Sequence, residues 1–424
     1  MSPRIRLCLL LHASVLFSSE CCQGSESVGD EARAGTVEAG SFRIESFGHR
    51  ECLVTDAKVN GHLVHLAVDT GSAPPVVIFS AETARLGLKI AKGAPTSGVL
   101  KPGHYQSSIS EPCSFQLLGA KVDNAVLLVA PDSQDPAESD GLSGLLGWSA
   151  IHNGIWGIFL GLPRTVLVPL TELPAADHNG VKLVVLDDDS TLSLRFADAR
   201  SDNPRIIVDT GNNDGVMLPP EQWRAWNLEH PDAARTIELA SVGGDSITPH
   251  EIAWADEIKI GNLVLRDVPV SEADRVYTQQ AAAGERIVAL GLAAVMRIDL
   301  AIDGSRKMAV AWTRFSPPRP FPHNRIGATF APPVVKPPDS SAGVRGIDLI
   351  AHVAARSPAA LADVRNGDVL LKVNGRSASE WWNDPKTGFD GPVGSVFDLS
   401  LRRGKSLIRR TVVAKDLLVP RSQN

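Results

Sequence analysis

The sequence predicts a mostly β protein with two similar lobes and a smaller C-terminal domain. Three observations lead to this expectation: an internal repeat, short apolar runs separated by turn residues, and a Pro-rich stretch at 316–324. A chain of 424 residues is too long for one ordinary core. Its 43% hydrophobic and 21% charged residues are typical of a globular protein.

The first residues are typical of an export signal. The basic start MSPRIR precedes the apolar run LCLLLHASVLF. This run is too short to cross a bilayer, which takes about 20 residues, but it suits a secretory signal peptide. We expect residues 1–24 to be the signal peptide of an exported, periplasmic or extracellular protein without a membrane span. Lipid anchoring at Cys21 is an alternative that the preceding Glu20 disfavours.

Composition and cysteine usage narrow the possible partners. The net charge is −6 and there is no long basic block, so we expect no nucleic-acid partner. No Cys/His cluster has metal-ligand spacing, and we expect neither a metal nor a cofactor. Cys52 and Cys113 are the only cysteines beyond the leader, and outside the cytoplasm they can form a disulfide. The alternative is two separate buried thiols.

An internal duplication organises residues 41–315. The stretches HLAVDTGSAPPVVIF (65–79) and RIIVDTGNNDGVMLP (205–219) both lead an apolar run into Asp-Thr-Gly. Landmarks recur in one order at a nearly constant offset of 140 to 144 residues, namely Asp69 and Asp209, Gly119 and Gly261, and Gly147 and Gly291.

Short strands and hairpin turns fill each copy. Asn60-Gly61 lies between alternating apolar residues and predicts a tight hairpin. The stretch SVGGDS (241–246) predicts a second hairpin tip. Two mostly β lobes follow, each with one Asp at the end of an apolar strand.

The paired motifs resemble those of the pepsin/retropepsin-like aspartic proteases. Each Asp-Thr-Gly is followed about eighty residues later by two apolar residues and a Gly, at Leu145-Leu146-Gly147 and Ala289-Leu290-Gly291. The resemblance implies a bilobal double-β fold, with lobes at 41–170 and 180–315 facing one cleft. It also implies an aspartic endopeptidase that acts on a peptide or protein substrate, with Asp69 and Asp209 as the catalytic pair.

The chemistry of such a pair explains why two copies are needed. Two carboxylates a few ångströms apart do not both ionise easily, so the pair holds one proton over a broad pH range. The charged member then deprotonates a water while the protonated member polarises the peptide carbonyl. This mechanism requires no covalent intermediate, metal or cofactor.

The resemblance assigns supporting roles to the residues beside each Asp. Thr70 and Thr210 are expected to brace the two loops against each other. Gly71 and Gly211 are expected to let the backbone turn tightly beneath the carboxylates.

Other positions near the motifs are less regular. Ser72 matches a hydroxyl that supports the first Asp, and Asn212 stands at its counterpart as a departure that still offers an amide donor. Asp214 is expected to be an exposed turn residue; the alternative is an inward-pointing carboxylate that raises the pKa of the pair by like-charge repulsion. Tyr105 is the candidate for the tip of a hairpin flap over the substrate, with a surface tyrosine as the alternative.

The C-terminal stretch ARSPAALADVRNGDVLLKVNGRS (355–377) resembles the PDZ domains of bacterial proteases. We expect a small α+β PDZ-like domain at 325–418 after a stiff, extended Pro-rich linker at 316–324. IGATF (326–330) matches a carboxylate-binding loop, which implies a peptide ligand. Pro332 and Pro385 argue against a complete groove, and Trp381 and Trp382 are expected to fill it as core.

Two functions remain open. The first is an active aspartic endopeptidase, and the second is an inactive peptide-binding or scaffold protein that uses the protease cleft or the PDZ-like domain. Both Asp-Thr-Gly motifs are retained, which favours the enzyme because a pure binder has no need for two apposed carboxylates.

Overall fold

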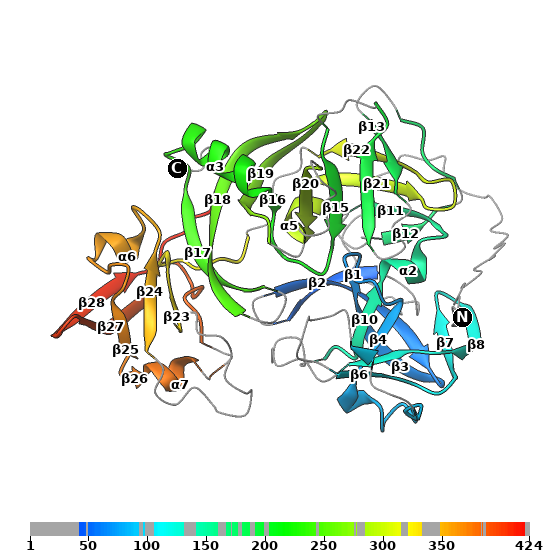
Figure 1. The fold of residues 1–424 in the computed structure, drawn as a ribbon, viewed down its shortest axis with the longest axis horizontal. Coiled ribbons are helices and arrows are strands. Elements are labelled where there is room, and N and C mark those ends of the chain that lie inside the picture. The colour runs from blue at the N-terminus through cyan, green and yellow to red at the C-terminus, as the bar shows by residue number, and fades with distance from the viewer. Residues whose placement is uncertain are drawn as a thin grey trace, which may run out of the picture.

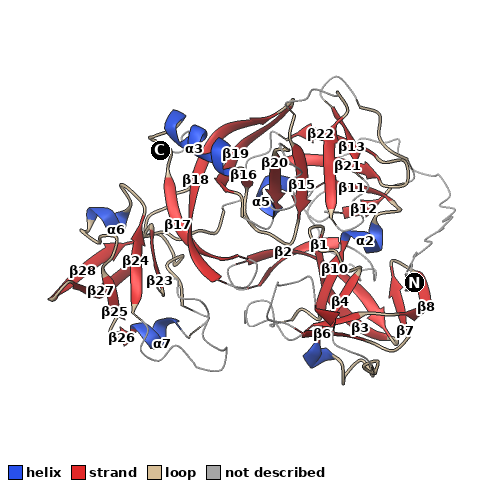
Figure 2. Cartoon of the chain, in the orientation of Figure 1, coloured by secondary structure: helices blue, strands red, loops and turns tan. Residues whose placement is uncertain are grey.

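The computed structural model describes most of the chain beyond the leader. The described residues are 42–47, 50–92, 96–97, 106–130, 141–159, 167–170, 172–176, 180–186, 191–198, 203–242, 246–274, 277, 285–314, 321–332, 348–382, 384 and 387–419. The signal-peptide prediction, Cys21 and the flap candidate Tyr105 therefore lie outside the described residues. Figures 1 and 2 show a fold built mainly of strands with a few short helices.

The first lobe is built on one ten-stranded sheet. Its elements are β1 (Phe42–Phe47), β2 (Arg50–Val59), β3 (His62–Asp69), β4 (Val76–Phe79), the 3₁₀ helix η1 (Ser80–Glu82), β5 (Thr96–Ser97), β6 (Gln106–Ile109), β7 (Cys113–Leu117), β8 (Ala120–Ala125), β9 (Leu128–Ala130) and β10 (Gly144–Gly147).

The second lobe forms a twelve-stranded sheet that also takes in two strands from the end of the first repeat. Its elements are α2 (Trp148–Ile151), β11 (Ile155–Phe159), β12 (Leu167–Pro169), β13 (Val181–Val185), β14 (Leu192–Phe196), β15 (Arg205–Asp209), β16 (Val216–Leu218), α3 (Pro220–Glu229), β17 (Arg235–Val242), β18 (Ser246–Ile260), β19 (Leu263–Glu272), β20 (Ile287–Gly291), α5 (Leu292–Val295), β21 (Ile298–Asp303) and β22 (Met308–Thr313).

A six-stranded sheet makes the C-terminal domain. Its elements are β23 (Ala328–Ala331), β24 (Leu349–Val353), α6 (Pro358–Leu361), β25 (Val369–Val373), β26 (Arg376–Ser377), α7 (Ala378–Trp382), β27 (Val396–Arg403) and β28 (Ser406–Val413).

Both predicted hairpins are confirmed. Asn60 and Gly61 have φ of 49° and 84°, the left-handed geometry that a two-residue turn of this type needs, and they join β2 to β3. β17 and β18 pair antiparallel from Arg235↔Ala253 to Val242↔Ser246.

The duplication is present in space as well as in sequence. β10 runs parallel to β3 with Gly147 opposite Asp69, and β20 runs parallel to β15 with Gly291 opposite Asp209. In both copies the strand after Asp-Thr-Gly also pairs parallel with a later strand, β4 with β9 and β16 with β19. Each Asp therefore ends a central strand, and this is why apolar residues precede it.

The two repeats meet around a local two-fold relationship. β11 pairs antiparallel with β21, and Gly157 lies opposite Ala301. These two residues are 301 − 157 = 144 positions apart, which equals the spacing between Gly147 and Gly291. This equivalent pair lies at the centre of the ladder, and Ile155↔Asp303 and Phe159↔Asp299 flank it at equal distances, as a local two-fold requires. One buried apolar cluster extends through both, including Leu66, Leu146 and Leu290.

The C-terminal domain lies against the second lobe, beside β17 and β18 (Figure 1). Asn324 joins them: its Nδ2 donates to Ile237 O at 3.0 Å and to Ala328 O at 2.7 Å. Thr236 Oγ1 donates to Asn324 O at 2.6 Å. An exposed ion pair, Arg356 with Asp232, adds a second link.

The end of the Pro-rich segment is packed rather than extended. Phe321 is buried in a cluster with Leu418 and three residues of the second lobe, Ile252, Trp254 and Ala293. His323 is also buried, and its Nε2 accepts hydrogen bonds from Leu417 N and Leu418 N at 3.0 and 3.3 Å. The segments that enter and leave the C-terminal domain therefore pack against each other, and both contact the second lobe through the cluster of Phe321 and Leu418.

The predicted disulfide between Cys52 and Cys113 is wrong. The two residues are not bonded to each other, and Cys113 Sγ donates to Ala125 O at 3.3 Å. In the β2–β7 pairing Val59 lies opposite Phe115, so Cys113 extends beyond the end of β2 away from Cys52. At about 3.3 Å per residue, the seven positions from Cys52 to Val59 span roughly 20 Å, whereas a disulfide needs Cα atoms within about 7 Å.

Within the described part of the chain we find no helix whose length and hydrophobicity would let it cross a membrane.

Candidate active site

Asp69 and Asp209 occupy equivalent places at the carboxyl ends of β3 and β15. The residues before them are fully buried, with Val68 and Val208 each at most 1% exposed. The two aspartates themselves are only partly buried. The apolar strands therefore hold the backbone rigidly, and each carboxyl group emerges where the strand ends.

The two carboxyl groups lie close together across the Asp-Thr-Gly loops. Gly71 N donates to Asp69 Oδ1 at 2.9 Å, and Gly211 N donates to Asp209 Oδ1 at 3.0 Å. A Cβ built on Gly71 would lie 2.4 Å from Cγ of Asp209, and one built on Gly211 would lie 2.4 Å from Cγ of Asp69. Each glycine thus donates its amide to its own Asp, and the opposite Asp occupies the space where a side chain on that glycine would stand.

The reason for these two glycines differs from the expected one. Neither is among the residues with positive φ, so no special backbone freedom is used. What they supply is space, because any side chain there would occupy the position of the opposite carboxylate.

Thr70 and Thr210 join the loops beneath the carboxylates. Thr70 Oγ1 donates to Val208 O and Thr210 Oγ1 donates to Val68 O, both at 2.6 Å. Each hydroxyl also accepts the backbone N–H of the other threonine, at 3.0 and 3.2 Å. Both side chains are buried, so these bonds fix the separation of the two loops without competition from water.

Ser72 and Asn212 differ more than their equivalent positions suggest. Ser72 Oγ is buried and makes no hydrogen bond within the described residues, so the expected support of Asp69 by this hydroxyl is not formed there. The Asn212 backbone N–H donates to Asp209 O at 3.3 Å, but its side chain forms no hydrogen bond with Asp209 among those of the described residues. Its Nδ2 donates to Tyr277 Oη at 3.3 Å and its Oδ1 accepts Asp214 N at 2.7 Å.

Tyr277 is a site residue that the sequence interpretation missed. Its hydroxyl donates to Asp209 Oδ2 at 2.6 Å, and its side chain is 8% exposed. No sequence motif marks Tyr277. It lies 68 residues after Asp209 and is not one of the residues that recur in the two repeats. The chain has only two tyrosines, and their scarcity was the one available indication.

Charged groups surround the second loop. Asp214 is partly buried, not exposed as expected, and its Oδ2 lies 3.7 Å from His250 Nε2. Burial raises the pKa of Asp274 above its usual range, an effect that His250 opposes and the charge of Asp214 reinforces. Asp214, His250 and Asp274 therefore form a group of titratable side chains that influence one another in the second lobe.

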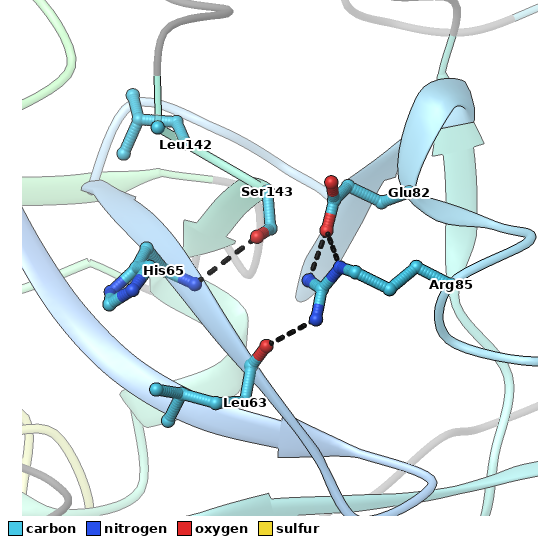
Figure 3. A pocket seen from close by; sticks show the side chains of 7 residues that line it. Leu63, His65, Glu82, Arg85, Leu142 and Ser143 are labelled. Carbon is cyan, nitrogen blue, oxygen red and sulfur yellow. Dashed lines mark hydrogen bonds and ion pairs between the residues drawn. The ribbon is translucent and has the colours of Figure 1, made fainter.

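The pocket drawn in Figure 3 is separate from this pair. It is lined by residues at the start of β3, in and after η1, and at 141–143. Ser143 Oγ accepts the backbone N–H of His65 at 3.3 Å, while the His65 ring points away from it (Figure 3) and its Nδ1 lies 2.6 Å from Asp56 Oδ1. The three residues do not form a Ser-His-Asp relay.

Metal ligation has no visible basis in the described ranges, where no three His, Cys, Asp or Glu side chains are grouped to hold an ion.

Comparison with known proteins supports the class of site. Residues 54–150 match the family model described as aspartyl protease. This stretch contains Asp69, its Asp-Thr-Gly loop and Leu145-Leu146-Gly147. The comparison with curated proteins finds no match. The matched domain and the mostly β, lobed architecture support an aspartic-type peptidase.

Proposed function

We propose that the protein is an aspartic endopeptidase whose catalytic pair is Asp69 and Asp209. The observation that carries this proposal is the reciprocal approach of each carboxylate to the glycine of the opposite loop. Two carboxyl groups held this close share a proton, because a second negative charge beside the first is unfavourable. Such a pair contains an acid and a base together.

Hydrolysis follows from these two roles. One carboxylate removes a proton from a water as the water oxygen attacks the peptide carbonyl carbon, and the other carboxyl group gives its proton to the carbonyl oxygen. The resulting diol gives one hydroxyl proton back to the pair as its carbonyl re-forms and the C–N bond breaks, and the leaving nitrogen takes up the other proton from the pair. One water is consumed, and the pair returns to its singly protonated state.

The surroundings suit this chemistry. The buried threonine bonds hold the loops at a fixed separation, so that the two carboxyl groups need little rearrangement during the reaction. The partial exposure of both aspartates leaves them reachable by water and by an extended peptide.

The C-terminal domain is proposed to be PDZ-like, with a structural rather than peptide-capturing role. In the loop at 326–330, Asn324 Oδ1 accepts both Ile326 N and Gly327 N at 3.0 Å, so two amides that would hold a peptide carboxylate are already used. Trp381 stacks on Phe389 at 5.2 Å between ring centroids, and Phe389 in turn contacts Phe330 of β23. These rings fill the space between β23 and α7.

We also propose that the protein is exported.

A direct test is cleavage of an unfolded protein substrate between pH 3 and 7, with and without pepstatin. We expect pepstatin-sensitive cleavage that is lost in Asp69→Asn and in Asp209→Asn, with both variants folded by circular dichroism. Binding of peptides without turnover would instead favour the second candidate, an inactive scaffold.

A further inference from the structure

A directed series of hydrogen bonds ends on Asp209. Because Asn212 Oδ1 accepts Asp214 N at 2.7 Å, the amide nitrogen of Asn212 is the group that faces Tyr277. Asn212 Nδ2 donates to the tyrosine oxygen at 3.3 Å. A tyrosine hydroxyl has one proton to give, and it is directed to Asp209 Oδ2, 2.6 Å away.

Both oxygens of Asp209 are therefore acceptors. Oδ2 accepts from Tyr277 and Oδ1 accepts from Gly211 N at 3.0 Å. Hydrogen bonds donated to a carboxyl group favour its ionised form, and bonds to an ionised acceptor are stronger than neutral ones.

The tyrosine is held so that it remains a donor. Its ring is buried in an apolar cluster with Ile207, Met217, Ala273, Ile287 and Ala289. Burial and the neighbouring charge of Asp209 raise the pKa of Tyr277 well above its ordinary value. The hydroxyl therefore stays protonated throughout the range in which a carboxylate pair works.

The two lobes differ at this point. Ser72, the counterpart of Asn212, is shorter, and its Oγ makes no hydrogen bond among the described residues. The Asn-Tyr series is thus a departure from the sequence symmetry of the repeat, and it ends on Asp209.

We propose that Tyr277 is a positioning residue that holds Asp209 as the ionised, water-activating member of the pair, so that Asp69 carries the shared proton. This inference rests on the proposed function. It assigns opposite roles to two aspartates that the duplicated sequence leaves equivalent: Asp209 takes the proton of the attacking water, and Asp69 protonates the carbonyl oxygen.

Other charged groups near Tyr277 influence one another's protonation. Asp214 lies on the loop after β15, His250 on β18 and Asp274 after β19. The charges of Asp209 and Asp214 both act on Tyr277, while His250 and Asp214 act on Asp274. A test must therefore change the tyrosine hydroxyl alone and leave these groups in place.

Tyr277→Phe in the full-length protein is that change, and Ile287→Val, which alters packing in the same cluster without touching a hydrogen bond, is the matched control. Removing a hydrogen bond to a charged acceptor should lower kcat about tenfold and leave KM within roughly twofold. It should also move the acid limb of the kcat/KM profile up by about one pH unit, because the ionised form loses stabilisation. The control should show neither change, and thermal melting should confirm that both variants are folded.

A second readout separates this inference from the proposed function. Carbon-13 NMR titration of the aspartate carboxyl groups follows proton uptake by the pair whether or not the enzyme turns over. A shifted titration in Tyr277→Phe supports the inference even if the wild type proves inactive, in which case only the proposed function fails. An unchanged titration and an unchanged acid limb would overturn it, as would an equal shift in Ile287→Val.

Discussion

Thr70 and Thr210 exchange hydrogen bonds across the two lobes, each hydroxyl donating at 2.6 Å to the carbonyl that precedes the opposite Asp-Thr-Gly. The backbone N–H of each threonine returns a bond to the hydroxyl of the other. The position of one Asp-Thr-Gly loop is thus fixed by the threonine side chain of the other.

Replacing these hydroxyls should loosen the pair. We expect Thr70→Val and Thr210→Val each to lower the free energy of unfolding by about 1–3 kcal/mol. Each change leaves one buried carbonyl and one buried amide without a hydrogen-bond partner. Thr70→Ser, which keeps the hydroxyl, is the control and should lose much less. The double valine variant should lose less than the sum of the two, since both belong to one network. Calorimetry decides this, and full additivity would show that the two threonines act independently.

Gly71→Ala and Gly211→Ala should abolish hydrolysis. An added Cβ would lie 2.4 Å from Cγ of the opposite aspartate, so one carboxylate must move out of its place. Gly391→Ala in the C-terminal domain is a suitable control, because the nearest atom to its added Cβ would be Ser395 Oγ at 3.2 Å. Activity of either loop variant within a few-fold of wild type would show that the two carboxylates need not be so close.

The attachment of the C-terminal segment should weaken in acid. Burial lowers the pKa of His323 below its ordinary value, although nearby Asp416 opposes this. His323 Nδ1 lies 2.6 Å from Phe321 O, so the neutral ring donates there and accepts Leu417 N through Nε2. A folded pKa below the unfolded value of about 6.5 means that the unfolded state binds more protons.

The stabilisation by neutral His323 is therefore complete above about pH 6.5 and is lost as the pH falls through the folded pKa. We expect hydrogen exchange at the amides of Leu417 and Leu418, corrected for its intrinsic pH dependence, to show less protection at pH 5 than at pH 7. His323→Gln should flatten the difference. Equal protection at both pH values in the wild type would contradict this assignment.

Deleting residues 325–424 should leave hydrolysis of a short peptide largely intact but destabilise the second lobe. Both aspartates precede residue 315, yet the deletion removes Leu418 from its contacts with Ile252 and Trp254. Leu418→Ala alone should cost about 2–5 kcal/mol in the same transition. Thermal melting of the full-length and the truncated protein tests this. An unchanged melting midpoint for the second lobe of the truncated protein would mean that the contact of Leu418 with Ile252 and Trp254 adds no stability.

The cysteines should remain two thiols in the purified protein. Alkylation under denaturing conditions, with and without prior reduction, should give the same mass for peptides that contain Cys52 and Cys113. A mass that changes on reduction by one cross-link would require β2 and β7 to lie differently from the pairing described above.

The sequence predicted the parts of this molecule that repeat. The two Asp-Thr-Gly loops, the Asn60-Gly61 turn and the 140–144 residue offset all depend on local pattern or on comparison of the chain with itself. The parts it missed depend on contacts between distant segments. Tyr277 reaches Asp209 from 68 positions away, and the register of β2 against β7, which separates the cysteines, is set by pairing that no single strand reveals.

The treatment of the C-terminal region shows the same limit. Proline-rich composition predicts an extended spacer, but composition does not say what surrounds it. Phe321 is buried because it packs in one cluster with Leu418 and Trp254, and buried His323 accepts the backbone N–H groups of Leu417 and Leu418. Both arrangements exist only in the folded chain.

The pairing of Gly157 with Ala301 has a consequence for how the proposed peptide substrate would be oriented. An assembly of two identical chains about such an axis would present the same face to a peptide and to its reverse, so neither direction would be preferred. Here both halves belong to one polypeptide, and each can change independently. Asn212 and Tyr277 stand beside Asp209, whereas Ser72 stands beside Asp69. In the proposed peptidase the two directions of a peptide across the pair would therefore not be equivalent.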